Sequence, residues 1–395
     1  MQNFEYCVPT KVVFGRDTES RCGELVRECG GTHALVVYGG GSAVRSGLLD
    51  RCTDSLKAAD IPYELLGGVQ PNPHLGLARE GVKKAIAMDA QLILAIGGGS
   101  VIDTAKAIAH GRANPDIDIW DFWLGKKKVE KSTPVGVILT IPASGSETSD
   151  SAVLTDETIL QKRGLNTDYN RPVFAIMDPT LAATLPRRQV ACGVTDILMH
   201  TLERYFNPIQ GNETTMQLAE SVLRVTIANG PAVVDNPGDY DAMSEIMWCG
   251  SLSHNGLTGL GGAKGLSVHP VSFALSEKFD VYHGESLTAI WSSWARYVLD
   301  TDVSRFARFA RNVWGVEAAD DKEAALAGIA AQEAFFRSIG MPVRIPALSC
   351  GRQDEADLAD LASRCSYGRT RTIGTFRVLG YDDILAIYQL ANNEE

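Results

Sequence analysis

The first half of the chain alternates short apolar segments with longer stretches whose apolar residues recur at helical spacing. The apolar segments cover residues 34–38, 63–66, 91–96, 136–140 and 172–177, and they contain many residues that favour β-strands. Strands that alternate with helices are joined by crossover connections, which build a parallel sheet with helices on its faces. The sequence therefore predicts an α/β region in this half.

The second half has a different pattern, in which strand-like segments become scarce and helical patterns dominate. Examples cover residues 215–228, 303–313, 322–339 and 381–391. Apolar residues recur there at the spacing of an amphipathic helix. We therefore predict two domains, an α/β domain over residues 1–185 and a helical domain over residues 186–395.

The charge balance limits the partners of the protein. The formal net charge is −11, and the basic residues cluster only at 126–128. Such a chain would be repelled by nucleic acid and by an anionic membrane, so neither is an expected partner. The eight cysteines include no Cys-x-x-Cys pair, which is typical of free thiols in a reducing compartment. Because no signal-peptide pattern and no apolar window of about 18 residues is found, we expect a cytoplasmic protein.

A glycine-rich turn follows the strand pattern at 91–96 and precedes a helical pattern at 101–108. It reads Gly97-Gly98-Gly99-Ser100. Glycine has no Cβ, so the backbone N–H groups and the N-terminus of the next helix can approach an anion closely. The turn is neither the Gly-x-Gly-x-x-Gly dinucleotide fingerprint nor a P-loop. A pyrophosphate-binding loop and a tight structural turn therefore both remain possible.

A second glycine turn, Gly39-Gly40-Gly41-Ser42, follows the strand pattern at 34–38, and Arg45 lies just beyond it. Two such junctions in one sheet favour a nucleotide-binding role over two plain turns. In dinucleotide sites an acid near a strand end binds the ribose 2′-hydroxyl and repels a 2′-phosphate. The segment contains no acid, so the predicted nucleotide is NADP, with NAD also possible.

Acidic and imidazole side chains point to a metal site in the helical half. Asp196 and His200 are four residues apart, so on a helix they share one face and can bind one ion. For this pair alone, an acid near a helix N-terminus beside a hydrogen-bonded histidine is the simpler reading. Three more of the seven histidines, His254, His269 and His283, follow close together along the chain. Their presence shifts the balance towards a metal site.

The spacing of the last two histidines requires a turn of the chain. His269 and His283 are fourteen residues apart, a separation of about 21 Å on a continuous helix. Two imidazoles on one zinc-sized ion bring their nitrogens within about 4.2 Å of each other. Residues 277–280 can end one helix and residues 282–285 can begin the next. One carboxylate with three imidazoles suits Fe²⁺ or Zn²⁺ better than Mg²⁺ or Ca²⁺.

Together these motifs resemble the iron-containing (group III) alcohol dehydrogenases, and within them the butanol-dehydrogenase-like, NADPH-dependent aldehyde reductases. The resemblance runs from residue 3 almost to the C-terminus. It is carried by PTKVVFG at 9–15, YGGGS at 38–42, QPNP at 70–73, GGGSVID at 97–103, TIPASGSE at 140–147, MDP at 177–179, the Asp196/His200 helix, and His269 with His283. It implies a Rossmann-like nucleotide-binding lobe, an all-α metal-binding lobe, a dehydroquinate-synthase-like architecture and a site in the cleft between the lobes.

The resemblance also implies the roles of individual residues. The implied metal ligands are Asp196, His200, His269 and His283. The implied cofactor-binding residues are Gly39, Gly40, Ser42, Gly97, Gly98, Gly99, Ser100, Asp103, Thr140, Ser144 and Lys162. The alternative for Asp103 is a buried polar anchor, and for His254 a hydrogen-bonded packing role is expected. Because helical lobes of this family associate, a homo-oligomer, a dimer, is expected by analogy.

Two positions depart from the family pattern. Relatives commonly carry a histidine four residues after the third ligand, where this chain has Phe273, and the reductase branch often has Trp where this chain has Leu266. The expected reaction is hydride transfer between a nicotinamide and a small alcohol or aldehyde whose oxygen the metal polarises. Phe273 cannot carry a proton, so no catalytic side chain is predicted, and metal-linked water or a ribose hydroxyl would supply the proton.

Two other functions are compatible with these motifs. Dehydroquinate-synthase-like lyases also use a metal and a nicotinamide, but they hold phosphorylated substrates with several basic residues, and only Lys264 lies near the ligands in this sequence. A non-catalytic nucleotide-binding relative would explain Phe273 and Leu266. The presence of all four candidate ligands argues against it.

Overall fold

A computed structural model describes residues 1–159 and 161–393 of the chain. The chain forms two compact units, one of residues Cys7–Thr184 and one of Leu185–Glu395 together with Met1–Tyr6. This division differs from the predicted domains because the first six residues belong to the helical unit. The backbone N–H of Gln2 donates to the carbonyl of Gly261 at 2.8 Å, which explains the difference.

The α/β unit is built on a six-stranded sheet in which all neighbouring strands are parallel, as the sequence predicts. Its strands, in spatial order, are β1 (Lys11–Phe14), β8 (Phe174–Met177), β5 (Val135–Leu139), β4 (Leu92–Gly97), β2 (Ala34–Gly39) and β3 (Tyr63–Val69). The edge strand β1 was not predicted, because its four residues are partly exposed and too few to show a period.

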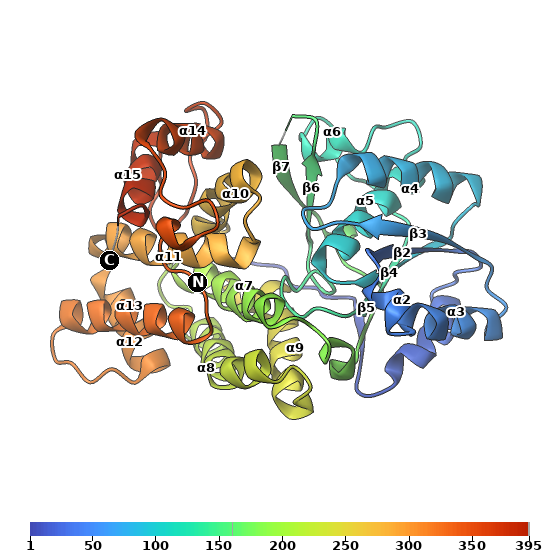
Figure 1. Cartoon of the computed structure of the whole chain (residues 1–395), viewed down its shortest axis with the longest axis horizontal. Helices are drawn as coiled ribbons and strands as arrows, with labels where there is room; N and C mark the ends of the chain where they lie inside the picture. Colours follow the sequence, from blue (N-terminus) through green and yellow to red (C-terminus); the bar gives the residue numbers. More distant parts are fainter. Residues whose placement is uncertain (160, 394–395) are drawn as a thin grey trace. The chain divides into compact units, whose positions relative to one another are not determined.

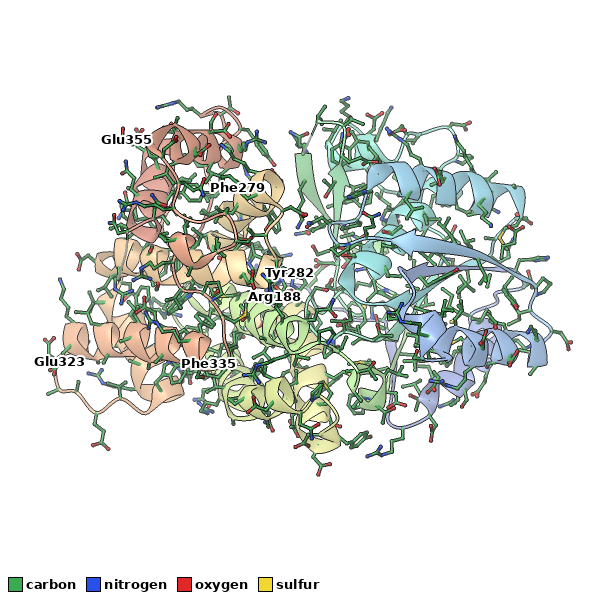
Figure 2. The ribbon with its side chains drawn as sticks, viewed as in Figure 1. Arg188, Phe279, Tyr282, Glu323, Phe335 and Glu355 are labelled. Carbon is green, nitrogen blue, oxygen red and sulfur yellow. The ribbon has the colours of Figure 1, made fainter. Side chains whose placement is uncertain are left out.

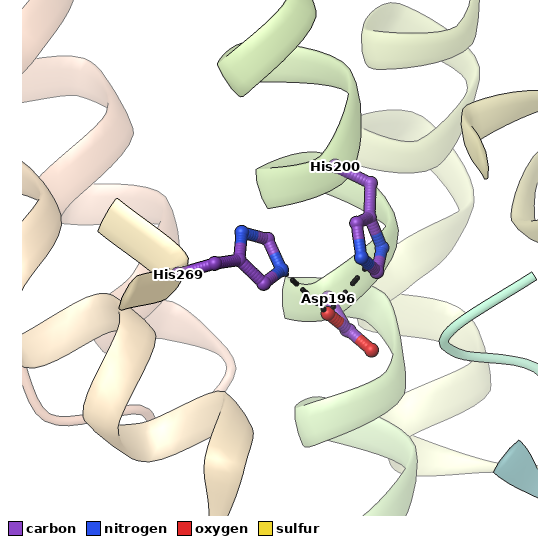
Figure 3. A group of neighbouring side chains, drawn as sticks. All are labelled: Asp196, His200 and His269. Atoms are coloured by element: carbon purple, nitrogen blue, oxygen red, sulfur yellow. Dashed lines mark ion pairs between the residues drawn. The ribbon is translucent and has the colours of Figure 1, made fainter. Parts of the chain in front are cut away.

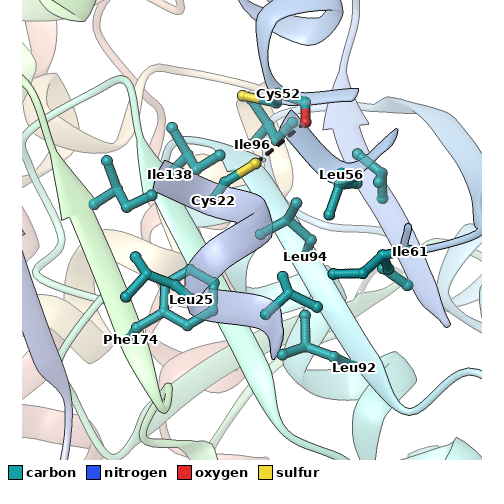
Figure 4. Packing of buried hydrophobic residues seen from close by; sticks show 14 of the residues in the cluster. Cys22, Leu25, Cys52, Leu56, Ile61, Leu92, Leu94, Ile96, Ile138 and Phe174 are labelled. Atoms are coloured by element: carbon teal, nitrogen blue, oxygen red, sulfur yellow. Dashed lines mark hydrogen bonds between the residues drawn. The ribbon is translucent and has the colours of Figure 1, made fainter. Parts of the chain in front are cut away.

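Helices cover both faces of this sheet, as Figure 1 shows. They are α1 (Cys22–Glu28), α2 (Ser42–Arg45), α3 (Leu48–Ala58), α4 (Leu75–Ala87), α5 (Gly99–Ala113) and α6 (Trp120–Trp123). On one face, Leu25 of α1 and Leu56 of α3 pack over Leu94 and Phe174 of the sheet (Figure 4). Because both faces are buried, β4 is apolar along its whole length instead of alternating.

An antiparallel hairpin that the sequence did not predict lies outside this sheet. It joins β6 (Ser151–Asp156) to β7 (Gln161–Asn166). β7 contains Gln161, Lys162, Arg163 and Asn166, so few of its residues favour a β-strand. Tertiary contacts decide its conformation: Val153 of β6 donates its backbone N–H to Asp103 of α5 at 2.9 Å.

The second unit is helical. Its helices are α7 (Arg187–Tyr205), α8 (Glu213–Asp235), α9 (Tyr240–His254), α10 (Val268–Phe279), α11 (His283–Val298), α12 (Val303–Trp314), α13 (Asp321–Ser338), α14 (Glu355–Cys365) and α15 (Tyr381–Ala391). No strand of the described part of the chain lies beyond residue 185, as the sequence predicts. None of the described helices combines the length and the apolar character that crossing a membrane requires.

Candidate functional site

Helix α7 supplies the first two residues of the candidate metal centre. Asp196 and His200 are one turn apart, and both side chains are buried. The Nδ1 atom of His200 lies 3.4 Å from the Oδ1 atom of Asp196 (Figure 3). The i, i+4 spacing therefore places both groups on one helix face, as expected from the sequence.

Two further histidines reach the same carboxylate from α10 and α11. The Nε2 atoms of His269 and His283 lie 3.4 Å and 3.7 Å from Oδ1 of Asp196. The chain reverses between them at Asp280, whose φ of 50° ends α10 in the left-handed conformation. α11 then begins at His283. The predicted turn between the two histidines is thus present, and three imidazoles surround one carboxylate oxygen.

Side chains beside His283 hold the start of α11 to the start of α7. The guanidinium of Arg188 donates from Nη2 to Glu285 at 2.6 Å and lies 4.1 Å from the ring centroid of Tyr282. Arg188 and Tyr282 are neighbours in Figure 2. Tyr282 and Glu285 lie on either side of His283 in the sequence, so their contacts with Arg188 position this fourth candidate ligand relative to α7.

The polar atoms of this cluster fit a divalent cation. Among the described residues, Oδ1 of Asp196, Nδ1 of His200 and Nε2 of His269 are buried without a hydrogen-bond partner. A buried polar atom without a partner costs about 1–3 kcal/mol, so three together need an explanation. Atoms of the same three residues lie within 4.8 Å of one another. A borderline divalent ion such as Fe²⁺ or Zn²⁺ accepts this mixture of nitrogen and oxygen donors.

Glu203 is a part of the site that the sequence reasoning missed. It lies one further turn along α7, and its buried carboxylate accepts hydrogen bonds from the backbone N–H groups of Ser267 at 2.6 Å and His269 at 2.7 Å. Its Oε1 atom is also 3.1 Å from Nδ1 of His269. Glu203 therefore holds the start of α10 and orients the imidazole. Its position, seven residues after Asp196, is the signal that could have found it.

The histidines differ in their affinity for protons. Burial, together with the imidazoles of His254 and His269, lowers the pKa of His200 well below its usual value. Burial also acts against protonation of His269, but the carboxylates of Asp196 and Glu203 overcome it and raise the pKa of His269. A neutral His200 keeps a nitrogen lone pair available to a metal ion.

His254 and Phe273 both lie against the candidate ligands. The ring of His254, at the end of α9, meets the ring of His200 edge-on, with 4.0 Å between centroids. The ring centroid of Phe273 lies 6.2 Å from that of His269 and 5.3 Å from that of His283. Phe273 therefore borders the cluster.

Leu266 precedes α10, and its carbonyl accepts the backbone N–H of Gly374 at 3.1 Å.

In the α/β unit, the first glycine turn joins β4 to the fifteen-residue helix α5. None of its glycines has a positive φ, so the reason for glycine is close packing. A Cβ at Gly98 would lie 2.9 Å from Cβ of Ile141, and a Cβ at Gly99 would lie 2.5 Å from Oγ of Ser144. Close packing therefore disfavours any side chain at Gly98 and Gly99. Within the described part of the chain no side chain caps the N-terminus of α5, so the turn also suits an anion.

The structure brings several of the predicted cofactor residues together at this turn. Thr140 donates its backbone N–H to the carbonyl of Gly97 at 3.1 Å, and Ser144 packs against Gly99. Lys162 lies on β7, where its Nζ donates to Oδ1 of Asn72 in the QPNP motif at 3.0 Å. The sequence alone predicts no contact for Asn72.

Asp103 has a different environment from the other predicted cofactor residues. Its Oδ1 accepts from Oγ of Ser146 at 2.6 Å and its Oδ2 accepts from the backbone N–H of Val153 at 2.9 Å. Burial raises the pKa of this carboxyl. Both oxygens are thus engaged by the protein, which favours the buried polar anchor over a direct cofactor contact.

The second glycine turn ends β2 at Gly39. A Cβ at Gly40 would meet nothing within 4 Å, and Gly41 has a φ of 129°. The side chain of Arg45 folds back over the turn, so that its Nη1 would be 3.0 Å from a Cβ at Gly41. A guanidinium thus lies beside the segment that contains Ser42.

Comparison with known proteins finds the same protein family in both units. Residues 9–179 match the model of the iron-containing alcohol dehydrogenases, and residues 190–392 match the C-terminal model of the Fe-containing alcohol dehydrogenase family. The chain is 37% identical to NADH-dependent butanol dehydrogenase A of Clostridium acetobutylicum over 98% of its own length and 99% of that protein. It is 33% identical to NADPH-dependent aldehyde reductase YqhD of Escherichia coli over 87% and 89% of the two chains.

The fold is also shared with a solved relative. NADH-dependent butanol dehydrogenase A of Thermotoga maritima superposes with a TM-score of 0.95 at 32% identity and covers 100% of this chain and 99% of that one. The sequence matches extend through the glycine turns and the four candidate metal ligands. The chain therefore belongs to the iron-containing alcohol dehydrogenase family.

Proposed function

We propose that this protein reduces small apolar aldehydes with NADPH at a single divalent metal ion held by Asp196, His200, His269 and His283. The observation that carries the proposal is the convergence of three imidazole nitrogens on one buried carboxylate oxygen. Family membership of the whole chain supports the same reaction class, oxidoreduction of alcohols and aldehydes with NAD(P)H. The presence of all four candidate ligands argues against the non-catalytic alternative that Phe273 left open, and the relatives give no support to the lyase.

The residues of the chain prepare the site for this reaction. When bound, the metal ion supplies Lewis-acid polarisation of a carbonyl oxygen, and the reduced nicotinamide supplies the hydride. Asp196 provides the one anionic ligand. Glu203 contacts Nδ1 of His269 and so directs Nε2 of the same imidazole towards Asp196. The turn at Gly97–Gly99 and the uncapped start of α5 suit the cofactor pyrophosphate, with Ser100, Thr140, Ser144 and Lys162 as further cofactor contacts.

The preference for apolar substrates rests on Phe273. Its ring borders His269 and His283, where it excludes water and offers no proton or hydrogen bond to a hydroxylated substrate. The preference for NADPH rests on the second glycine turn, which has no acid and lies beside the guanidinium of Arg45. The names of the relatives include both NADH-dependent and NADPH-dependent enzymes.

Steady-state turnover and elemental analysis test the proposal together. Oxidation of NADPH and NADH is followed with straight-chain aldehydes and with hydroxylated ones such as glyceraldehyde, and metal content is measured on the same sample. We expect one metal ion per chain, turnover of aldehydes, and a higher kcat/KM with NADPH and apolar aldehydes. His269→Ala and His283→Ala should lower metal content and activity together. Full metal content in these variants would show that the ligands are wrong, and a higher kcat/KM with NADH would contradict the cofactor assignment.

A further inference from the structure

Lys106 is a buried amine that the proposed reaction does not use. It lies on α5, and its side chain has no exposed surface. Its Nζ donates to Oγ and the carbonyl of Ser146, both at 2.8 Å, and to the carbonyl of Ser151 at 2.7 Å. The carbonyl of Ser149 lies at 3.4 Å. A single ammonium group thus contacts the backbone carbonyls of Ser146, Ser149 and Ser151.

Asp103 assists from the preceding turn of the same helix. Its carboxylate accepts from Oγ of Ser146, which also accepts from Lys106, and from the N–H of Val153. Burial lowers the pKa of Lys106 to about 8, although Asp103, Glu147 and Asp150 favour its charged form. Burying an ammonium group is costly, so its retention in a packed interior requires several acceptors. The hydrogen bonds of Lys106 and Asp103 therefore tie the segment from Ser146 to Val153 to α5.

The segment held by Lys106 is continuous with the proposed nucleotide site. Ser144 lies two residues before Ser146, and its Oγ occupies the space that a Cβ of Gly99 would need. The backbone N–H of Ser146 is 3.4 Å from the same Oγ. Gly99 begins α5, so the helix that carries Lys106 also presents the glycine turn. A shift of Ser146 would therefore displace Ser144 against that turn.

We propose that Lys106 is a positioning residue for the cofactor: by holding residues 146–151 against α5, it sets the spacing between the glycine turn at 97–99 and Ser144. This inference rests on the proposed nucleotide site. Lys106 itself has no exposed atom with which to contact the cofactor, so it acts through the two loops. Its loss should weaken nicotinamide binding and leave the metal centre intact, since all four candidate ligands belong to the other unit.

Cofactor binding in the absence of substrate tests the inference. NADPH and NADH are titrated into the metal-loaded protein, and the Kd is read from nucleotide fluorescence. Lys106→Met should raise the Kd of the preferred cofactor by about tenfold or more, because several hydrogen bonds to a charged donor are lost. Its KM for the cofactor should rise more than its kcat falls, and its metal content should equal that of the wild type. Lys84→Met, which removes a partly exposed lysine that donates to the carbonyl of Leu65 at 2.9 Å, is the matched control.

A second variant covers the case in which Lys106→Met does not fold. Ser146→Ala removes one acceptor of Lys106 and one donor to Asp103 but keeps the buried charges, so it should fold and weaken cofactor binding by a smaller factor. Wild-type Kd values in folded Lys106→Met, or in folded Ser146→Ala if the first variant is lost, would overturn the role of Lys106. Failure of the wild type to bind either nicotinamide would instead overturn the nucleotide site and, with it, this inference.

Discussion

Glu203 is one buried carboxylate that contacts both the start of α10 and the candidate metal ligand His269. Glu203→Gln removes the charge that favours the proton on Nδ1 of His269, so Nε2 is less well presented to the ion. We expect metal affinity to fall about 10–100-fold, the usual cost of losing such a partner. Competition with a chelator of known affinity measures this change. The control is Glu245→Gln, an exposed position on α9, and equal metal affinity in the two variants would contradict the role of Glu203.

Phe273 is the residue on which the proposed preference for apolar aldehydes depends. Phe273→His places a titratable group, with an unperturbed pKa of about 6.5, beside His269 and His283. General acid–base assistance is typically worth about 100-fold or more where proton transfer limits the rate, so relative activity towards hydroxylated aldehydes should rise. The measurements are kcat/KM for the aldehyde panel and the pH–rate profile. An unchanged ranking and profile in metal-loaded protein would place Phe273 outside the reacting pocket.

Gly40 tests which nucleotide the chain prefers. The structure leaves open space around a Cβ at this position, so Gly40→Asp should fold normally. A carboxylate there would repel a 2′-phosphate and accept a hydrogen bond from a ribose hydroxyl. We expect the ratio of kcat/KM for NADPH to that for NADH to fall below one. If the ratio does not move in folded protein, the second glycine turn does not contact the adenosine ribose.

At the scale of the elements, His110 links the C-terminal part of α5 to the loops beside it. Its two ring nitrogens lie 2.9 Å from Oγ of Ser132 and 2.8 Å from Oδ1 of Asn170. Burial lowers the pKa of His110 to about 4, while the hydrogen bond with Asn170 opposes the shift. The native protein therefore resists protonation at a pH where the unfolded chain, with a pKa of about 6.5, accepts the proton.

This difference makes the stability depend on pH. Between pH 6.5 and about 4 the unfolded state binds more protons at this site, so the free energy of unfolding falls as the pH falls, by an amount on the order of 3 kcal/mol. His110→Gln keeps polar atoms at the site but does not titrate, so its stability should decline less over this range. Urea unfolding at pH 7 and pH 4.5 measures the free energy of unfolding of the wild type and of His110→Gln. An equal loss of stability in both proteins would contradict the buried neutral state of His110.

At the scale of the whole molecule, the proposed metal ion should stabilise one unit selectively. Asp196 and His200 on α7, His269 on α10 and His283 on α11 all belong to the unit that contains residues 185–395. Removing the ion leaves buried polar atoms of Asp196, His200 and His269 unsatisfied and takes one bound group from His283, so these three helices should become less stable. Hydrogen exchange after chelation should therefore accelerate most in α7, α10 and α11. Uniform acceleration over both units, or none, would contradict a metal bound by these residues.

Local patterns in the sequence were sufficient for much of the architecture. The strand and helix alternation, the glycine turns after β2 and β4 and the pairing of Asp196 with His200 depend on residues close in the chain, where periodicity and spacing act directly. The end of α10 at Asp280 was also readable, because two histidines fourteen residues apart cannot meet on a straight helix. β1 and the β6–β7 hairpin escaped prediction because partners elsewhere in the chain stabilise them.

Only the tertiary structure decided how distant residues act as one group. The contact of His269 with Asp196 joins α10 to α7, and the role of Glu203 depends on the same packing. The contact of Lys106 with Ser151 likewise requires α5 to meet the strand that follows a long loop. Such distances are set by how helices and strands pack, which depends on all the side chains between them and has no local signature. Sequence patterns could therefore nominate the chemical groups of this site, but only the packed chain determines which of their atoms meet.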